Sequence, residues 1–328
     1  MKAFLVEKKD DEFISDVKEV ITPKCENENE IVIKVSYSSL NYKDALSSIG
    51  NPGVTKKFPH ITGIDVAGTV SESTSNIFKV GERVLVTGYD LGMNCDGGHA
   101  QYVKVPASWV ARIPDAISEK DIMTLGTAGL TAALSVNELR ENGIKSETGE
   151  ILVTGATGGV GSIAVSILRK MGYTVTAITG KKERIDFLKR IGANEVIHRD
   201  EFDIETNRPL MSEKYAGVID TVGGSILATA LKQVKYDGVV TCCGLTSSHE
   251  LNTNVFPFIL RGIRLIGIDS VECKLEKKQA AWEKLASKWR IDSLSNITTE
   301  ITLDEIKATY EKILSGKIVG RYVVKIDE

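Results

Sequence analysis

A glycine-rich loop between an apolar strand and a helix constrains this chain more than any other feature. Residues 151–154 (ILVT) have the pattern of a short buried strand, and 155–161 (GATGGVG) follow directly. Apolar residues then recur at helical spacing from Val160 to Met171, and Gly172 is placed to end the helix. Glycines at 155, 158 and 161 permit a tight turn, close approach to a pyrophosphate and close helix packing. The pattern predicts a dinucleotide-binding strand–loop–helix unit, in which the helix N-terminus attracts a phosphate.

Short apolar strands continue this rhythm along the middle of the chain. They alternate with helical stretches from about Asp121, which is typical of a parallel sheet with crossover helices. Together with 151–154 there are six, the number in a doubly wound dinucleotide-binding sheet. The other five are 173–179, 195–198, 217–221, 238–243 and 264–268.

The end of the second strand favours NADPH over NADH. An NAD site carries an acid about 20 residues after the glycine loop, where it binds the ribose 2′-hydroxyl. Here the strand ends Thr179-Gly180-Lys181-Lys182, and the first acid, Glu183, belongs to the following helix. Lysine and threonine attract a 2′-phosphate, which an acid would repel. The alternative is that Lys181 and Lys182 only form the solvated start of a helix.

Two more strand ends should face the ligand crevice, since carboxyl ends of parallel strands meet at one edge. The fourth strand ends at Asp220, for which capping of the next helix is an equal alternative. The fifth ends in Cys242-Cys243-Gly244-Leu245. Both cysteines fall in a predicted buried strand and are interpreted as small apolar side chains.

The first hundred residues show a different pattern. Short β-branched runs at 31–36, 65–70 and 83–87 are separated by Gly, Pro, Asn and Ser, which predicts an irregular antiparallel barrel or sandwich. A last strand, 321–326, is expected to join this first domain, after a charged helix at 277–288. Residues 200–215 are expected to be a surface loop. The predicted domains are 1–122 with 272–328, and 123–271.

Composition narrows the class of protein. The length of 328 residues suggests about two domains. A formal net charge of −3 argues against a nucleic-acid binder, and no apolar run is long enough for a membrane span. Five cysteines without a C-x-x-C pair indicate a reduced, cytoplasmic protein. Four scattered histidines predict no metal site, and no G-x-S-x-G motif supports a hydrolase.

The order of these features resembles the medium-chain dehydrogenase/reductase superfamily. Zinc alcohol dehydrogenases of this superfamily carry G-H-E-x-x-G where this chain has Gly63-Ile64-Asp65-Val66-Ala67-Gly68. Because Ile64 replaces the zinc-binding histidine, the chain resembles the zinc-free, quinone oxidoreductase-like branch. Finer matches resemble the YhdH-type acrylyl-CoA reductase (NADPH) subfamily. They are 38–46 (SSLNYKDAL), 59–70 (PHITGIDVAGTV), 126–132 (GTAGLTA), 219–223 (IDTVG), 257–261 (PFILR) and 267–270 (GIDS).

The resemblance implies a Rossmann α/β domain, a doubly wound parallel sheet, beside a GroES-like β-barrel catalytic domain. It also implies NADPH as the cofactor and a set of cofactor contacts. Lys181 stands where the subfamily has arginine, and lysine cannot form the bidentate fork of arginine. The subfamily's C-terminal asparagine corresponds to Asp327, so no contact is expected there. The implied contacts are Tyr42, Thr127, Gly155, Thr157, Gly158, Gly159, Val160, Gly161, Thr179, Gly180, Lys181, Arg199, Leu245, Ile259 and Ser270.

The implied reaction is hydride transfer to the β-carbon of an α,β-unsaturated acyl thioester, without a metal. Negative charge then develops on the thioester oxygen, and hydrogen-bond donors would stabilise it. Candidate catalytic residues are Asn41, Tyr42 and Asp44. The alternatives are turn capping for Asn41 and Asp44, and stacking on the cofactor for Tyr42. Asp65 is expected to be a satisfied buried acid, and Lys56, Lys57 and Arg261 are candidate partners for coenzyme A phosphates.

Two other functions stay open on the sequence. The first is a broader NADPH-dependent reductase of quinones, enones or aldehydes, which uses the same hydride transfer. The second is an NADPH-binding sensor without turnover. The sixth strand, 264–268, is expected at the sheet edge, where an apolar strand can pair with a second copy, so a homodimer is predicted.

Overall fold

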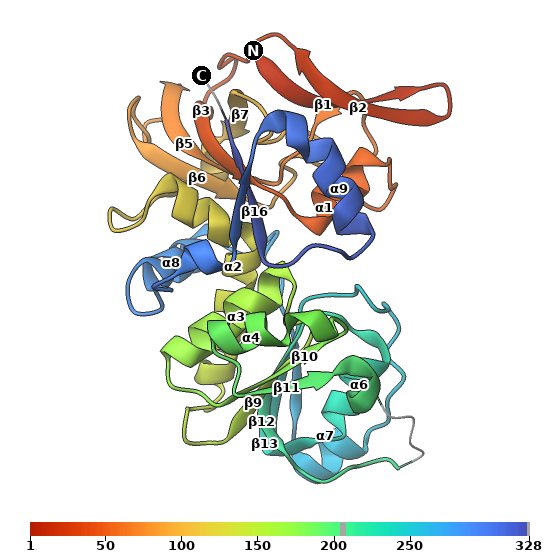
Figure 1. Cartoon of the computed structure of the whole chain (residues 1–328). Coiled ribbons are helices and arrows are strands. Elements are labelled where there is room, and N and C mark those ends of the chain that lie inside the picture. Colours follow the sequence, from red (N-terminus) through yellow and green to blue (C-terminus); the bar gives the residue numbers. More distant parts are fainter. Residues whose placement is uncertain (204–207, 327–328) are drawn as a thin grey trace. The chain divides into compact units, whose positions relative to one another are not determined.

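The computed structural model describes residues 1–203 and 208–326, and it divides into two units (Figure 1). The first unit comprises residues 1–127, 270–287 and 293–328, and the second comprises 128–269 and 288–292. In the described part of the chain, no helix is long and apolar enough to cross a membrane. The boundaries expected from the sequence, after residues 122 and 271, stay a prediction.

The second unit is built on one six-stranded parallel sheet. All six strands expected from the apolar runs are present, which confirms the doubly wound sheet. Their order, β11-β10-β9-β12-β13-β14, places the strand before the glycine loop in the middle. The strands are β9 (Glu150–Val153), β10 (Val175–Thr179), β11 (Glu195–His198), β12 (Tyr215–Asp220), β13 (Val234–Cys242) and β14 (Arg264–Gly267).

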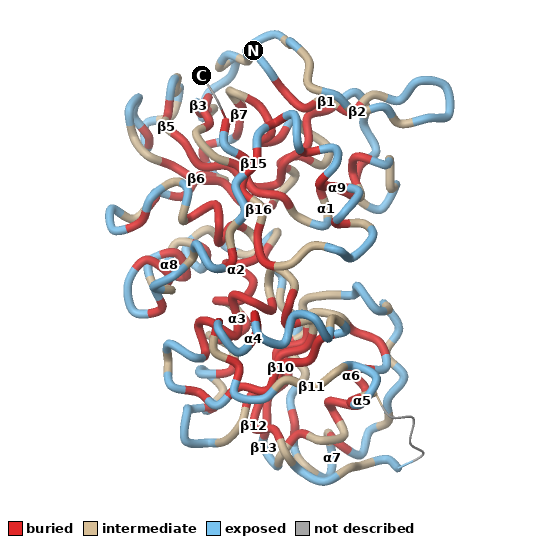
Figure 2. The backbone as a smooth tube through the Cα atoms, in the orientation of Figure 1, coloured by how far each residue is buried: buried red, intermediate tan, exposed pale blue. Residues whose placement is uncertain are grey.

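Helices connect these strands and cover the sheet. The apolar stripe expected between residues 160 and 171 forms α3 (Gly159–Lys170), in which the residues from Gly161 to Leu168 are buried. Figure 2 shows buried strands in the interior of this unit and exposed segments around them. The prediction of a loop at 200–215 is wrong for its first residues, because Arg199–Phe202 form helix α5. Residues 204–207 of that loop lie outside the described residues. The other helices are α4 (Ile185–Ile191), α6 (Gly224–Leu231) and α7 (Phe256–Arg261), with the short 3-10 turn η2 (Lys182–Arg184).

The first unit is mostly β-structure, as its sequence pattern predicted. A seven-stranded sheet has the order β15-β16-β3-β5-β6-β8, with β7 paired to β3, and a three-stranded sheet has the order β2-β1-β4. The C-terminal strand β16 pairs with β3, which confirms that the chain returns to this unit. The strands are β1 (Lys2–Lys9), β2 (Glu12–Glu19), β3 (Glu30–Ser39), β4 (His60–Ile61), β5 (Asp65–Ser73), β6 (Arg83–Thr87), β7 (Tyr102–Pro106), β8 (Ala111–Arg112), β15 (Thr298–Ile301) and β16 (Arg321–Lys325).

Helices pack around the strands of the first unit. Side chains of β3, β5 and β6 share one apolar core with Phe4 and Tyr310. The charged helix expected at 277–288 is α8 (Leu275–Ala286), whose buried Lys278 donates to the carbonyl oxygens of Thr87 (2.7 Å) and Val271 (2.8 Å). The remaining helices and 3-10 turns are α1 (Tyr42–Ser48), η1 (Ala107–Trp109), α9 (Ile306–Leu314), η3 (Leu294–Asn296) and η4 (Leu303–Glu305).

One helix, α2 (Glu119–Glu141), is interrupted at Gly126. Gly126 has φ +52° and ψ −156°, which is far from helical geometry. A Cβ atom at this position would lie 2.6 Å from Oδ2 of Asp65 and 2.7 Å from Oγ of Ser39. Because only glycine fits, the helix stops and restarts here, and the N–H group of Thr127 donates to the Asp65 carboxylate.

Candidate active site

The glycine loop of the second unit is a cradle that added side-chain atoms would fill. Gly155 has φ +57°, and a Cβ there would lie 2.4 Å from Oγ1 of Thr221. A Cβ on Gly161 would lie 2.5 Å from the carbonyl oxygen of Gly155. The loop and the first turn of α3 are therefore packed backbone against backbone. This is the fit that a pyrophosphate requires, since the phosphates must approach the main chain closely.

The start of α3 supplies donors for an anion. Gly158 is the N-cap, and the first turn contains Gly159, Val160 and Gly161 without an acidic side chain. The first N–H groups of a helix have no partner within the helix, and its dipole is positive at this end. Thr157, just before the cap, is buried. The loop residues expected from the sequence therefore lie together and fit the phosphates of a dinucleotide.

Three side chains that were expected to bind the 2′-phosphate follow two neighbouring strand ends. β10 and β11 are parallel, with Thr179 opposite His198, so Lys181 and Arg199 follow the same edge of the sheet. The backbone N–H of Lys181 donates to Oγ1 of Thr179 (3.0 Å), and a Cβ on Gly180 would lie 3.0 Å from the Arg199 side chain. Burial lowers the pKa of the Lys181 ammonium group. The three residues expected to bind the 2′-phosphate are therefore neighbours at one edge.

The ends of β12 and β13 meet at the same edge around a buried carboxylate. Asp220 accepts from Oγ1 of Thr154 (2.7 Å) and from the N–H of Gly223 (2.8 Å). It holds the turn before α6, whose N-cap is Gly223, so the alternative that Asp220 is itself the cap is wrong. Burial is the main cause that raises its pKa. Leu245 follows this edge with 64% of its surface exposed, and apolar surface is thus open beside the strand ends.

The expectation that both cysteines lie in a strand is confirmed for Cys242 and wrong for Cys243. Cys242 is the last residue of β13 and is partly exposed, and Cys243 lies just beyond the strand. The Cys243 thiol donates to the carbonyl oxygen of Asp220 (3.3 Å). Burial, followed by the nearby Asp220 charge, raises the pKa of Cys243 to about 12. A thiol with this pKa stays protonated and is a poor nucleophile.

One residue expected at the ligand, Arg261, is bound elsewhere in the second unit. The Arg261 side chain donates to the carbonyl oxygens of Lys232 (2.9 Å), Val234 (3.0 Å) and Met211 (2.5 Å), at the amino ends of β12 and β13. Its donors are thus occupied, and the expected role at coenzyme A phosphates is wrong for Arg261. Ile259 lies two residues earlier on the short helix α7 and is 68% exposed, and its expected contact with the cofactor stays a prediction.

In the first unit, helix α1 presents Tyr42 and buries Asp44. Tyr42 is the first helical residue, and 44% of its surface is exposed. Asp44 is fully buried and accepts from the N–H groups of Asn41 (2.8 Å) and Ile64 (2.9 Å). The capping role that was one alternative for Asp44 is therefore what its contacts provide. Tyr42 is the member of the expected catalytic group whose side chain faces solvent.

Asp65 organises the residues just before α1. Its Oδ2 accepts from Oγ of Ser39 (2.6 Å), Nδ2 of Asn41 (2.8 Å) and the N–H of Thr127 (2.8 Å). Its Oδ1 accepts from Oγ1 of Thr127 (2.5 Å). This confirms the expectation of a satisfied buried acid. The same contacts turn the Asn41 amide inward, where its second donor contact is Oγ of Ser39 (3.3 Å), so Asn41 holds the loop, and a catalytic role for it stays a prediction.

Burial and charge repulsion act together on Asp44. No cation contacts its carboxylate among the described residues, and Asp65 is a second buried acid nearby. Burial first, and the Asp65 charge second, raise the pKa of Asp44 to about 7. A buried histidine, His99, lies in the same unit, bonded to Thr62 (2.9 Å) and Tyr310 (3.0 Å). Burial lowers the pKa of His99 to about 3, so this ring is neutral at physiological pH.

The remaining expected residues are placed as follows. Ser270 is buried in the first unit, and Lys56 and Lys57 are exposed on the segment after α1. Asp327 lies outside the described residues. Sequence reasoning missed Arg321, a buried arginine on β16, because its position among apolar residues resembles an ordinary strand. Within residues 1–203 and 208–326, no group of three or more His, Cys, Asp or Glu side chains could hold a metal ion.

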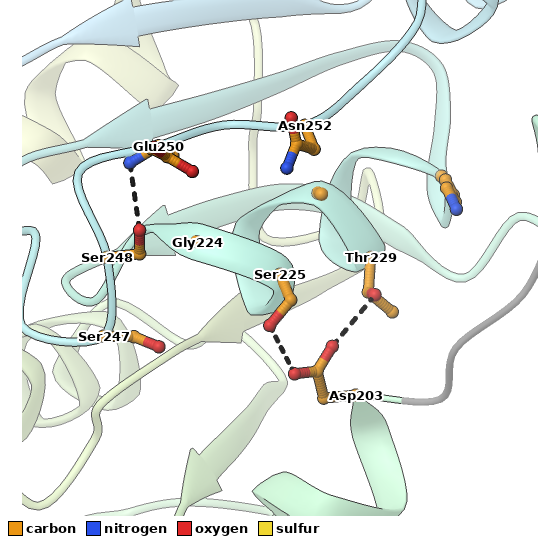
Figure 3. A pocket seen from close by; sticks show the side chains of 10 residues that line it. Asp203, Gly224, Ser225, Thr229, Ser247, Ser248, Glu250 and Asn252 are labelled. Atoms are coloured by element: carbon orange, nitrogen blue, oxygen red, sulfur yellow. Dashed lines mark hydrogen bonds between the residues drawn. The ribbon is translucent and has the colours of Figure 1, made fainter.

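A separate cavity of about 610 Å³ runs along the outer side of α6 (Figure 3). Asp203 lies at its wall, with its carboxylate close to the hydroxyl groups of Ser225 (2.5 Å) and Thr229 (3.4 Å). Ser248 and Glu250 lie on the chain that passes over the helix. None of the residues expected from the sequence lines this cavity, so it is not the dinucleotide site described above.

The fold and the glycine loop define a dinucleotide-dependent oxidoreductase of two units. Comparison with known protein families supports this class of protein for both units of the chain. Residues 27–115 match the alcohol dehydrogenase GroES-like domain, and residues 159–288 match the zinc-binding dehydrogenase domain. The first match confirms the GroES-like unit that the resemblance implied.

Full-length relatives narrow the family. The chain is 43% identical over 326 residues to YhfP of Bacillus subtilis, named a candidate quinone oxidoreductase, with 99% of this chain and 98% of that protein covered. It is 41% identical to the acrylyl-CoA reductase AcuI of Ruegeria pomeroyi, with 91% and 90% covered. The YhdH oxidoreductase of Salmonella enterica, crystallised with NADP, is 40% identical with a TM-score of 0.95 and full coverage of both chains. The chain belongs to the medium-chain dehydrogenase/reductase superfamily, in the YhdH-type, quinone oxidoreductase-like branch.

Proposed function

We propose that this protein uses NADPH to reduce the C=C bond of an α,β-unsaturated acyl thioester of the acrylyl-CoA type. The choice of NADPH rests on one observation: Thr179, Lys181 and Arg199 lie together beside the glycine loop. These three side chains offer several hydrogen-bond donors to a 2′-phosphate. NADP in the related Salmonella structure supports the same choice. The relative named acrylyl-CoA reductase supports the substrate class. Bound NADPH supplies the hydride for the β-carbon.

The residues of this chain have two tasks in the reaction. The backbone of residues 155–161 and the first turn of α3 bind the pyrophosphate and so fix the cofactor. In the first unit, Tyr42 donates its hydroxyl hydrogen to the thioester oxygen, where negative charge develops. Asp44 and Asp65 do not touch the substrate; they hold the backbone and the Asn41 amide around Tyr42. Hydride addition at the β-carbon leaves an enolate, and the Tyr42 O–H bond then breaks as its proton passes to the α-carbon. The tyrosinate that remains regains a proton from water.

Two further proposals concern assembly and location. β14 is an edge strand of the described sheet, and it follows α7, whose Ile259 and Leu260 are 68% and 55% exposed. An open edge beside apolar side chains supports a homodimer through β14. Light scattering should give twice the chain mass at micromolar concentration, and a single-chain mass would contradict the dimer. The five free cysteines support a cytoplasmic location.

The assay that tests the function follows NADPH oxidation with acrylyl-CoA and with a simple quinone, each also with NADH. We expect acrylyl-CoA with NADPH to give the largest kcat/KM. We expect Tyr42→Phe to lower kcat by about 100-fold and to change the Kd for NADPH little, because it removes one donor to the developing charge. Turnover with the quinone alone would move the function to the broader reductase. NADPH binding without turnover of either acceptor would indicate a sensor.

A further inference from the structure

Arg321 ties the segment before α1 to two distant parts of the first unit. It lies on β16, and 4% of its side chain is exposed. Its Nε donates to the carbonyl oxygen of Thr124 (2.9 Å), and Nη1 donates to the carbonyl oxygen of Leu40 (3.1 Å) and to Oδ1 of Asn41 (3.3 Å). Nη2 donates to Oγ of Ser39 (2.9 Å). One guanidinium group therefore holds three consecutive residues, 39–41, that lead directly into α1.

Arg321 forms a buried charged cluster with Asp65 and Asp44, so an uncharged side chain of similar size could not replace it. Nη2 lies 4.0 Å from Oδ2 of Asp65, which is itself fully buried. Removing the guanidinium would leave the Asp65 charge without its cation, which costs more than the pair contributes. Asp44, also fully buried, adds a second acid nearby. The cluster thus holds two carboxyl groups and one guanidinium.

The shape of the site also demands arginine. The planar fork reaches Ser39, Leu40 and Asn41 from two nitrogen atoms and Thr124 from the third, and a single lysine nitrogen cannot reach all four. A Cβ on Gly126 would lie 2.9 Å from Nη2, so a side chain at position 126 would displace the guanidinium. The guanidinium therefore helps to fix residues 39–41, together with Asp65.

We propose that Arg321 is a positioning residue for the reduction, which acts through Leu40 and Asn41 to fix Tyr42. It fixes both the backbone and the side chain of the residues immediately before Tyr42, and it is buried away from the substrate itself. This inference rests on the proposed function in one respect, the donation from Tyr42 to the thioester oxygen. Catalysis responds steeply to small displacements of such a donor.

The kinetic test is a double-mutant cycle of Arg321→Lys with Tyr42→Phe. In the wild-type background, we expect Arg321→Lys to lower kcat by tenfold or more and to change the KM for NADPH less than twofold. In the Tyr42→Phe background, we expect the same substitution to lower kcat less than threefold, because the group that it positions is gone. An equal loss in both backgrounds would mean that Arg321 has a purely structural role and would overturn the inference.

A structural readout decides the same point without turnover. We expect Arg321→Lys to speed amide hydrogen exchange in residues 39–48 relative to wild type. Arg261→Lys is the matched control, because this arginine also binds backbone carbonyl groups but lies in the second unit. If Arg321→Lys does not fold, Ser39→Ala removes one acceptor of the same guanidinium and should show both effects more weakly.

The two proposals can fail separately. If wild type reduces neither acrylyl-CoA nor the quinone, the proposed function fails, and exchange in residues 39–48 still tests whether Arg321 fixes this segment. Unchanged exchange in these residues would overturn the positioning inference even in an active enzyme. Faster exchange in both arginine variants would overturn it as well, since the effect would then be general destabilisation.

Discussion

The predicted sites of the two units are formed by different parts of the chain: mainly backbone in the second unit and buried side chains in the first. In the second unit the site is mainly backbone: a glycine loop, a helix N-terminus and strand ends in register. In the first unit it is a set of buried side chains from distant segments, such as Ser39 and Arg321, which are 282 residues apart. A backbone site tolerates most side-chain changes and fails at its glycines. A buried charged site depends on each polar partner, because a lost partner leaves another group unpaired.

The largest effect is expected from Gly161→Ala, which tests whether the second unit depends on backbone contact. The new Cβ would lie 2.5 Å from the carbonyl oxygen of Gly155 and 2.7 Å from Cα of Ala156, so α3 must move away from the loop. We expect the Kd for NADPH, measured by fluorescence titration, to rise about 100-fold, or roughly 3 kcal/mol.

The control for this variant is Gly172→Ala. Gly172 has φ +81° but no atom within 4 Å of the added Cβ. The Gly172→Ala protein should lose about 1 kcal/mol of stability through backbone strain and keep its affinity for NADPH. Equal affinities for the Gly161 variant and wild type would show that close packing of the loop is not required.

An intermediate effect is expected from Lys181→Gln. This variant tests whether the Lys181 charge contributes to NADPH binding and not to the stability of the fold. Loss of one charged contact to the 2′-phosphate should raise the Kd for NADPH about tenfold and leave the Kd for NADH unchanged. The melting temperature without cofactor should stay the same, unlike that of a variant in the buried cluster. Lys182→Gln, at an exposed neighbour, is the control and should shift either Kd less than about twofold. A parallel loss of NADH affinity would contradict the assigned role.

The smallest effect is expected from Asp44→Asn, which probes the charged cluster through pH. The raised pKa, about 7, means that the folded protein keeps a proton on Asp44 that the unfolded chain releases near pH 4. Asp44 therefore stabilises the fold less as pH rises between about 4 and about 7. Asparagine does not titrate, so the melting temperature of the variant should fall less than that of wild type across this window.

Melting curves between pH 5 and pH 8 measure this difference. Asp11→Asn, at an exposed position, is the matched control and should follow wild type at every pH. Wild-type and Asp44→Asn curves that run parallel across the window would show that Asp44 titrates near its ordinary value. That outcome would also weaken the argument that the cluster holds more carboxyl groups than cations.

The sequence by itself determined the second unit in most of its detail. Six apolar runs predicted six strands, and the loop 155–161 predicted a phosphate site, since strand, turn and helix are local and adjacent in the chain. The prediction that Thr179 and Lys181 bind the 2′-phosphate rests on the same local order of strand and turn. The errors, at Arg261 and Cys243, came from residues whose position depends on helix direction and strand length, which local patterns leave open.

Only the tertiary structure decided how the first unit uses its polar residues. Asn41, Asp44 and Asp65 were visible as polar residues in the sequence, but their partners are Thr127, Ile64 and a C-terminal arginine that no local pattern connects to them. Non-local side-chain contacts depend on how the strands pair, and β16 pairs with β3 although the second unit lies between them in the sequence. The inward turn of Asn41 and the buried cluster around Asp65 are consequences of that pairing.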